Sequence, residues 1–156
     1  IKYGGGCFND MSPYAASLFR LFINKKILIK NIYSSFVNKN KLNISFSIFT
    51  TYKKLSLFSY FSHDGKYQNE LTFVSNEKIV RIYRAFSPPS DKKLKIFIQN
   101  KNKNKNIMKI IKKDDVFINY FNDIFINIKN KKFKKFYKIL LEDSLFREKL
   151  KKKIWR

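Results

Sequence analysis

Apolar side chains recur at helical spacing near the start of the chain. Residues 12–24 place most of their apolar side chains on one face, which is the pattern of an amphipathic helix. Ser12 is a suitable N-cap, and Pro13 at the first helical position loses no hydrogen bond there. The pattern predicts a helix over 12–24 with a basic exit at Lys25 and Lys26.

Several later segments are rich in β-branched and aromatic residues, which favours strands. His63, in a turn signal with Asp64 and Gly65, predicts a hairpin between two of them and is itself expected to be an exposed, non-catalytic loop residue. The segment 41–54 fits strand alternation and helical spacing equally well, so periodicity leaves it open. The strands are predicted over residues 27–37, 55–62, 68–75, 77–86 and 92–99.

The second half of the chain begins after an alternating Lys/Asn stretch at 100–106, which reads as a linker or surface insertion. The apolar residues of 136–156 have an approximately helical rhythm, which predicts a basic terminal helix. The expected fold class is therefore α/β in the α+β sense. The predicted organisation is an extension at 1–11, an N-terminal lobe at 12–99, the linker, and a C-terminal lobe with its helix at 107–156.

Charge limits the kinds of partner. The 156 residues carry 34 Lys and Arg against 11 Asp and Glu, a net charge of +23. A polyanion such as RNA or DNA is the leading partner for such a surface. The single Cys7 and single His63 cannot build a disulfide or a usual metal site, so no metal and no cofactor are expected. Every apolar run is too short to cross a bilayer.

A series of short motifs runs through the first half of the chain: Ser12-Pro13 with Ala15, Leu18, Arg20 and Leu21, then Asn40 to Phe46, Glu70 to Phe73, Arg81 to Pro88, and Leu94 to Phe97. In this order the motifs resemble the bacterial and organellar small-subunit ribosomal protein eight family. That resemblance implies that the open segment 41–54 begins as a helix, giving an α-β-α-β-β lobe. In the second half, lysines replace the hydroxyl-rich RNA-contacting loop of the family.

The resemblance implies a structural, non-enzymatic protein of the small ribosomal subunit that binds the central domain of its ribosomal RNA beside neighbouring ribosomal proteins. The chain is rich in residues that AT-rich codons encode, which indicates an organelle, expected to be the mitochondrion. No membrane or small-molecule partner is expected. Basic and short polar side chains are the expected RNA ligands, because A-form RNA is recognised by its shape, phosphates and hydroxyls. These candidates are Arg20, Asn24, Lys25, Lys26, Arg81, Arg84, Ser87, Lys92, Lys93, Lys129, Asn130, Lys131, Lys132, Lys134 and Lys135.

Two alternatives use other parts of the same chain. A membrane-surface protein would use the basic C-terminal helix against anionic lipid. A metal-dependent nuclease would need carboxylates that converge on magnesium, and these are few and lie in dissimilar contexts. The carboxylates in question are Asp64, Asp114, Asp115 and Asp123.

Overall fold

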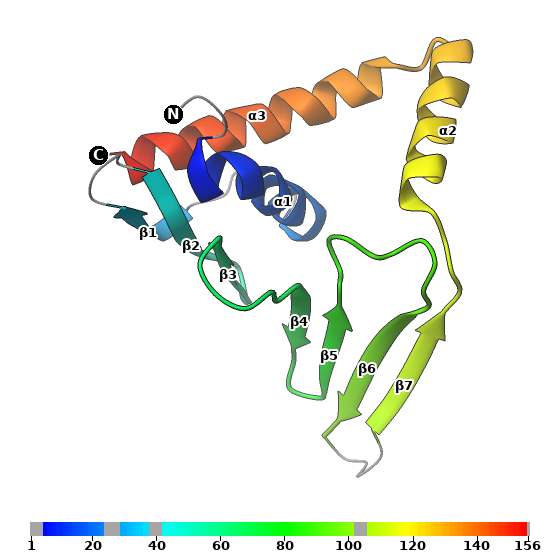
Figure 1. The fold of residues 1–156 in the computed structure, drawn as a ribbon, viewed down its shortest axis with the longest axis horizontal. Coiled ribbons are helices and arrows are strands. Elements are labelled where there is room, and N and C mark those ends of the chain that lie inside the picture. Colours follow the sequence, from blue (N-terminus) through cyan, green and yellow to red (C-terminus); the bar gives the residue numbers. More distant parts are fainter. Residues whose placement is uncertain (1–4, 24–28, 38–41, 102–105, 156) are drawn as a thin grey trace. The chain divides into compact units, whose positions relative to one another are not determined.

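The computed structural model describes residues 5–23, 29–37, 42–101 and 106–155 of the chain. Within these ranges it has three helices and two antiparallel sheets, which confirms the predicted α+β class (Figure 1). The chain divides into two compact units. The first joins residues 1–65 to residues 134–156, and the second spans residues 66–133. The predicted boundaries at 99 and 106 fall inside the second unit.

The first unit is a three-stranded sheet packed with two helices from opposite ends of the chain. The strands lie in the order β1-β2-β3, and α1 and α3 pack on each other and on the sheet (Figure 1). The terminal helix predicted from 136 onward is confirmed as α3. The elements are α1 (Gly6–Phe22), β1 (Ile29–Val37), β2 (Leu42–Tyr52), β3 (Leu55–Ser62) and α3 (Lys134–Ile154).

The core of this unit lies between α1, the sheet and the end of α3. Phe8 of α1 meets Phe46 of β2 edge to face, with ring centroids 5.3 Å apart. Ile48 lies two residues further along β2 and Leu150 comes from α3; all four side chains are essentially inaccessible to water. Because alternate residues of a strand share a face, Phe46 and Ile48 present an apolar surface of β2 to α1.

The first helix begins at Gly6, six residues before the predicted cap. Ser12 is buried inside it and accepts a hydrogen bond from Arg147 Nε of α3, at 2.9 Å. Pro13 has no N–H to offer the carbonyl of Asn9, one turn earlier. Arg147 Nη2 lies 3.5 Å from that carbonyl oxygen and donates to it instead. Packing against α3 therefore lets the helix continue through the proline.

Within the ambiguous segment 41–54, Leu42–Tyr52 form strand β2, so the helix implied there by the ribosomal resemblance is wrong. Its strand neighbours supply the reason: β2 pairs with β1 on one side and β3 on the other, which satisfies its backbone groups along most of its length. Strand β3 confirms the prediction for 55–62, and β1 confirms that for 27–37 over residues 29–37; residues 27 and 28 lie outside the described ranges.

The second unit is a four-stranded antiparallel sheet in the order β4-β5-β6-β7, followed by a helix. The predicted hairpin around His63 is wrong, because β3 and β4 belong to different sheets. The 100–106 stretch ends β6 and begins β7, a strand that the sequence analysis missed. The elements are β4 (Glu70–Val74), β5 (Lys78–Tyr83), β6 (Leu94–Asn100), β7 (Asn106–Ile111) and α2 (Val116–Lys129).

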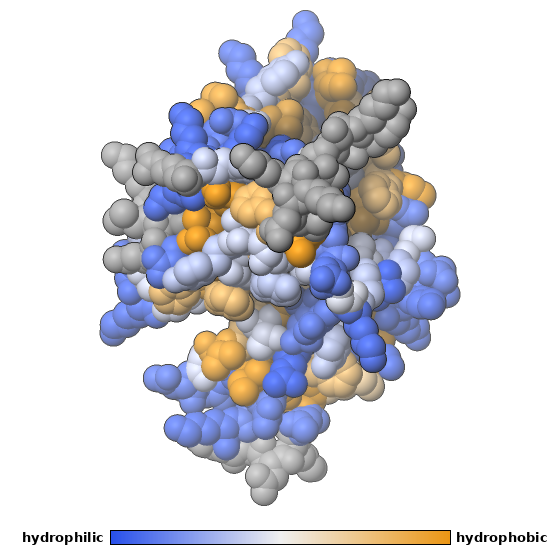
Figure 2. Space-filling model, turned by 60° about the vertical axis from the view of Figure 1, so that its left-hand side comes forward, coloured by the Kyte–Doolittle hydropathy of each residue, from blue (hydrophilic) through white to orange (hydrophobic). Residues whose placement is uncertain are grey.

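Large apolar side chains are exposed in both units. On the face shown in Figure 2, orange apolar residues lie scattered among blue hydrophilic ones. In the second unit, none of the side chains that the structure describes is buried, including those of the apolar helix α2. No helix in the described ranges is both long and apolar enough to span a membrane.

Candidate functional site

The outward face of α1 carries ionisable side chains at helical spacing. Asp10 and Tyr14 are four residues apart, so they lie one turn apart on the same face of the helix. Both side chains are exposed, whereas Ala15 and Phe19 on the opposite face are buried in the core. The packing of α1 against the sheet therefore fixes which side of the helix presents its carboxylate and its phenol to solvent.

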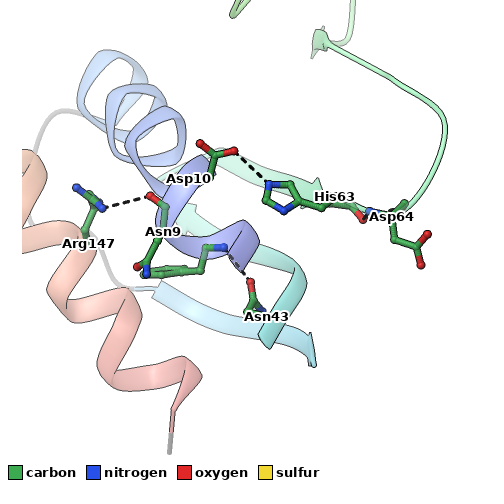
Figure 3. A network of polar contacts seen from close by, with 8 residues as sticks. Asn9, Asp10, Asn43, His63, Asp64 and Arg147 are labelled. Carbon is green, nitrogen blue, oxygen red and sulfur yellow. Dashed lines mark hydrogen bonds and ion pairs between the residues drawn. The ribbon is translucent and has the colours of Figure 1, made fainter. Parts of the chain in front are cut away.

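His63 follows β3 and faces the carboxylate of Asp10. Its Nε2 atom lies 3.2 Å from Asp10 Oδ2, with both side chains partly exposed (Figure 3). The His63 backbone N–H donates to the carbonyl of Ile44 at 3.0 Å. The residue after β3 is thus tied to β2 through its backbone and to α1 through its ring.

A thiol lies beside this pair, inside the core. The pKa of the Cys7 thiol is raised to about 11, mainly by burial and also by the nearby Asp10 carboxylate, while a backbone hydrogen bond from His63 acts in the opposite direction. The side chain is fully inaccessible to water. Since the thiolate is the nucleophilic form, Cys7 is a core residue at neutral pH and is not the reactive group of the site.

Gly6 allows the start of α1 to approach β2 closely. Its φ angle is +78°, which disfavours residues with a side chain. A Cβ atom at this position would overlap the backbone carbonyl oxygen of Asn43. Gly6 therefore helps to hold the first turn of α1, and with it Asp10, against the sheet.

The chemistry available at this site is proton transfer. Asp10 and His63 form an acid–base pair, and the Tyr14 phenol can donate a proton to an oxygen that gains negative charge. We define the Asp10 site as Asp10, Tyr14 and His63. Within the described part of the chain, no group of three or more possible metal ligands occurs.

The residues predicted as RNA ligands are distributed over both units. Arg20 is ion-paired with Asp143 of α3, at 3.1 Å, inside the first unit. Arg84 Nε lies 3.3 Å from the Ser87 carbonyl, and Ser87 Oγ lies 3.1 Å from the Tyr67 hydroxyl. Hydrogen bonds from Ser87 and Asn69, with a smaller effect of Arg84, lower the pKa of the Tyr67 phenol.

The other predicted ligands lie at several positions in the fold. Arg81 is on β5, Lys92 and Lys93 precede β6, and Lys134 begins α3. Residues 129–132 form the end of α2 and the turn after it, where Asn130 is the C-cap and Lys131 has φ +55°. Asn24, Lys25 and Lys26 lie outside the described residues, as does the side chain of Lys135.

Three of the four carboxylates of the nuclease alternative have local roles. Asp115 caps α2 by accepting from the N–H groups of Phe117 and Ile118, at 2.9 and 3.1 Å. Asp114 and Asp123 accept from asparagine side chains of the same helix, at 2.7 and 2.9 Å. These contacts explain the carboxylates as helix-stabilising groups.

The sequence analysis missed the Asp10 site because it treated residues 1–11 as an extension and His63 as an isolated loop residue. His63 is exposed, as predicted, but it has a carboxylate partner. One signal was present in the sequence: an aspartate and a tyrosine stand four residues apart directly after a run of glycines. The contact with His63, 53 residues away, had no sequence signal.

No protein-family model and no curated protein matches the chain. Solved structures of KijD10, a 3-ketoreductase from Actinomadura kijaniata, match its fold. The complex with NADP has a TM-score of 0.86 at 13% identity over 99% of this chain. A tyrosine-to-phenylalanine variant with TDP-benzene and NADP has a TM-score of 0.87 at 12% identity over 97%. The open conformation has a TM-score of 0.76 at 14% identity over 83%.

These comparisons overturn the ribosomal resemblance. The fold is shared with a ketoreductase, no ribosomal family model matches, and β2 stands where that resemblance implies a helix. The conclusions that depended on the resemblance are corrected with it: the ribosomal role, the ribosomal RNA and ribosomal protein partners, the exclusion of a small-molecule substrate, and the non-enzymatic character. The chain covers 49%, 46% and 41% of the three KijD10 chains, about half of their length.

Proposed function

We propose that the chain forms the part of a ketoreductase-type oxidoreductase that holds the carbonyl substrate and exchanges a proton with it. The observation that carries this proposal is the Asp10 site on a fold shared with a 3-ketoreductase over nearly the whole chain. The likeness supports the fold, and the arrangement of Asp10, Tyr14 and His63 supports the chemistry.

Tyr14 is the proton donor in this proposal. A carbonyl oxygen that becomes a hydroxyl must gain a proton, and a positioned phenol supplies one in a single transfer. Asp10 lies one turn before Tyr14, and its partner His63 is the acid–base group through which a proton can be exchanged with solvent. The rigid attachment of α1 to the sheet keeps the two helical side chains in a fixed relation.

The described residues do not fit a dinucleotide site. Dinucleotides bind at the crevice of a mostly parallel sheet, where a glycine-rich turn leads from a strand into a helix. Within the described residues both sheets are wholly antiparallel. The proposal therefore assigns no NADP contact to this chain and derives no step through NADP. The predicted mitochondrial location remains a prediction and is independent of this role.

The test measures NADP-dependent turnover. The protein is purified from the cells that make it, together with any proteins bound to it. Thymidine-diphosphate sugars and NADP are supplied, and formation of NADPH is followed. This assay measures the reverse reaction, in which a sugar hydroxyl is oxidised to the carbonyl by NADP and its proton passes to Tyr14. We expect turnover that falls about a hundredfold or more in Tyr14→Phe. Tyr60→Phe is the matched control, because Tyr60 is an exposed tyrosine of β3 in the same unit. Absence of sugar-dependent NADPH formation, or equal turnover in both variants, would contradict the proposal.

A further inference from the structure

One face of the second sheet gathers a cation, aromatic rings and amides. Arg81 of β5 pairs in register with Phe97 of β6, and Gln99 of β6 pairs with Asn106 of β7. Directly paired residues share a face, and so do alternate residues of one strand. Tyr83, two residues after Arg81, therefore lies on this face as well.

These side chains line a cavity of about 150 Å³. A space of about this size accommodates a benzene-sized ring, and it is smaller than the pocket that encloses a whole drug-sized ligand. The site can therefore hold one ring of a larger molecule, with the rest of that molecule lying across the sheet. The lining residues are Ile79, Arg81, Tyr83, Phe97, Ile98, Gln99 and Asn106.

The wall of the cavity suits a planar aromatic group. The rings of Tyr83 and Phe97 meet edge to face, with centroids 5.4 Å apart and planes at 83°. Gln99 and Asn106 add amide groups that both donate and accept hydrogen bonds, as the edge of a nucleobase requires. An aromatic wall beside amides is better matched to a heteroaromatic base than to a purely apolar ring.

Arg81 adds an exposed positive charge to this wall. It forms no ion pair within the ranges that the structure describes. Lys95 alternates with Phe97 on β6 and adds a second positive charge to the same face. Glu70 of β4 places a negative charge on the same face, because it pairs with Tyr83 of β5. Its carboxylate accepts a hydrogen bond from the Thr72 hydroxyl at 2.8 Å. A guanidinium in this setting favours phosphate, which it can bind through two hydrogen bonds.

We propose that this face of β5, β6 and β7 binds the nucleoside diphosphate portion of a ligand. The base lies against Tyr83 and Phe97, and the phosphates lie at Arg81. The binding itself follows from the side chains of this sheet face. That the bound ligand is the substrate rests on the proposed function.

The experiment measures binding of thymidine diphosphate to the full chain by isothermal titration calorimetry at fixed ionic strength. Thymidine and inorganic pyrophosphate serve as the two halves of the probe. We expect Arg81→Ala to weaken binding at least about tenfold. Lys109→Ala is the matched control: Lys109 pairs with Ile96, so it lies on the opposite face of the same sheet, and its loss changes the net charge equally.

The control separates a site from general attraction to a basic protein. Equal weakening in Arg81→Ala and Lys109→Ala would overturn the proposal, and so would pyrophosphate binding as tightly as thymidine diphosphate. Circular dichroism checks the fold of each variant, and Arg81→Gln replaces Arg81→Ala if that variant does not fold. Failure of the proposed function is distinguishable, because it would remove turnover while leaving this binding and its dependence on Arg81 intact.

Discussion

Asn43 Oδ1 of β2 accepts a hydrogen bond from the backbone N–H of Phe8, 35 residues earlier, at 2.9 Å. The same amide donates to the carbonyl oxygens of Ser35 and Ser45, at 3.3 and 2.8 Å. Its side chain is almost fully buried. One asparagine thus satisfies an N–H in the first turn of α1 and two carbonyls of the sheet, and it attaches the helix that carries Asp10 to β2 (Figure 3).

Replacing this amide is expected to destabilise the first unit. Asn43→Ala leaves the Phe8 N–H and two carbonyls without their partner in a buried place, so we expect the free energy of unfolding to fall by about 2–4 kcal/mol. Denaturant unfolding measures the change. Asn31→Ala, at an exposed position of β1, is the control and should change it by less than about 0.5 kcal/mol. Equal effects would show that the buried amide has no special role.

Leu150 tests whether the end of the chain completes the core of the first unit. Its side chain is fully buried among residues of that core. Leu150→Ala should therefore lower the free energy of unfolding by about 2–5 kcal/mol, through lost burial and the cavity that remains. Leu140→Ala on the same helix is the control, because Leu140 is exposed, and it should cost less than about 1 kcal/mol. A small loss in both variants would contradict the packing of α3.

The buried thiol of Cys7 should make the stability of the protein depend on pH in the alkaline range. The pKa of this thiol is about 11 in the folded protein, against 9.0 for an unperturbed cysteine thiol. Above pH 9 the unfolded chain loses this proton first, so stability is complete below pH 9 and falls as the pH rises from 9 to 11. The loss attributable to Cys7 reaches about 2–3 kcal/mol.

The measurement for Cys7 is the free energy of unfolding of wild type and Cys7→Ala across pH 8 to 11. Lysines and tyrosines titrate in the same range in both proteins, so only the difference between the two curves reports the thiol. We expect that difference to shrink or reverse with rising pH, as the wild type loses its advantage. Parallel curves would show that the thiol has the same pKa folded and unfolded.

The pair of Asp10 and His63 should matter more for turnover than for stability. Both groups are partly exposed, and ion pairs of this kind contribute less than about 1 kcal/mol. We expect Asp10→Asn and His63→Gln to reduce sugar-dependent NADPH formation by tenfold or more while unfolding changes little. Asp91→Asn, at an exposed position of the second unit, is the control. Unchanged turnover in both variants of the pair would remove it from the catalytic site.

Strand positions were readable from the sequence where the residues alternate and belong to strongly β-favouring types, as in 55–62. The segment 41–54 was not, because Leu42, Phe46 and Phe49 satisfy helical spacing as well as strand alternation. Pairing on both sides by β1 and β3 decides it in favour of the strand. The start of α1 was misplaced for a related reason: Pro13 normally marks a first turn, but here Arg147 of α3 takes the place of the missing N–H.

The sequence by itself determined the charge, the α+β class, the basic terminal helix and most of the strands. These follow from composition and from short-range periodicity, which depend on backbone geometry within a few residues. Tertiary structure alone decided that the last helix completes the core of the first unit and that His63 meets Asp10. It also decided that Arg81 shares a cavity with Phe97. These relationships join side chains distant in sequence, and only packing and strand register bring such groups together.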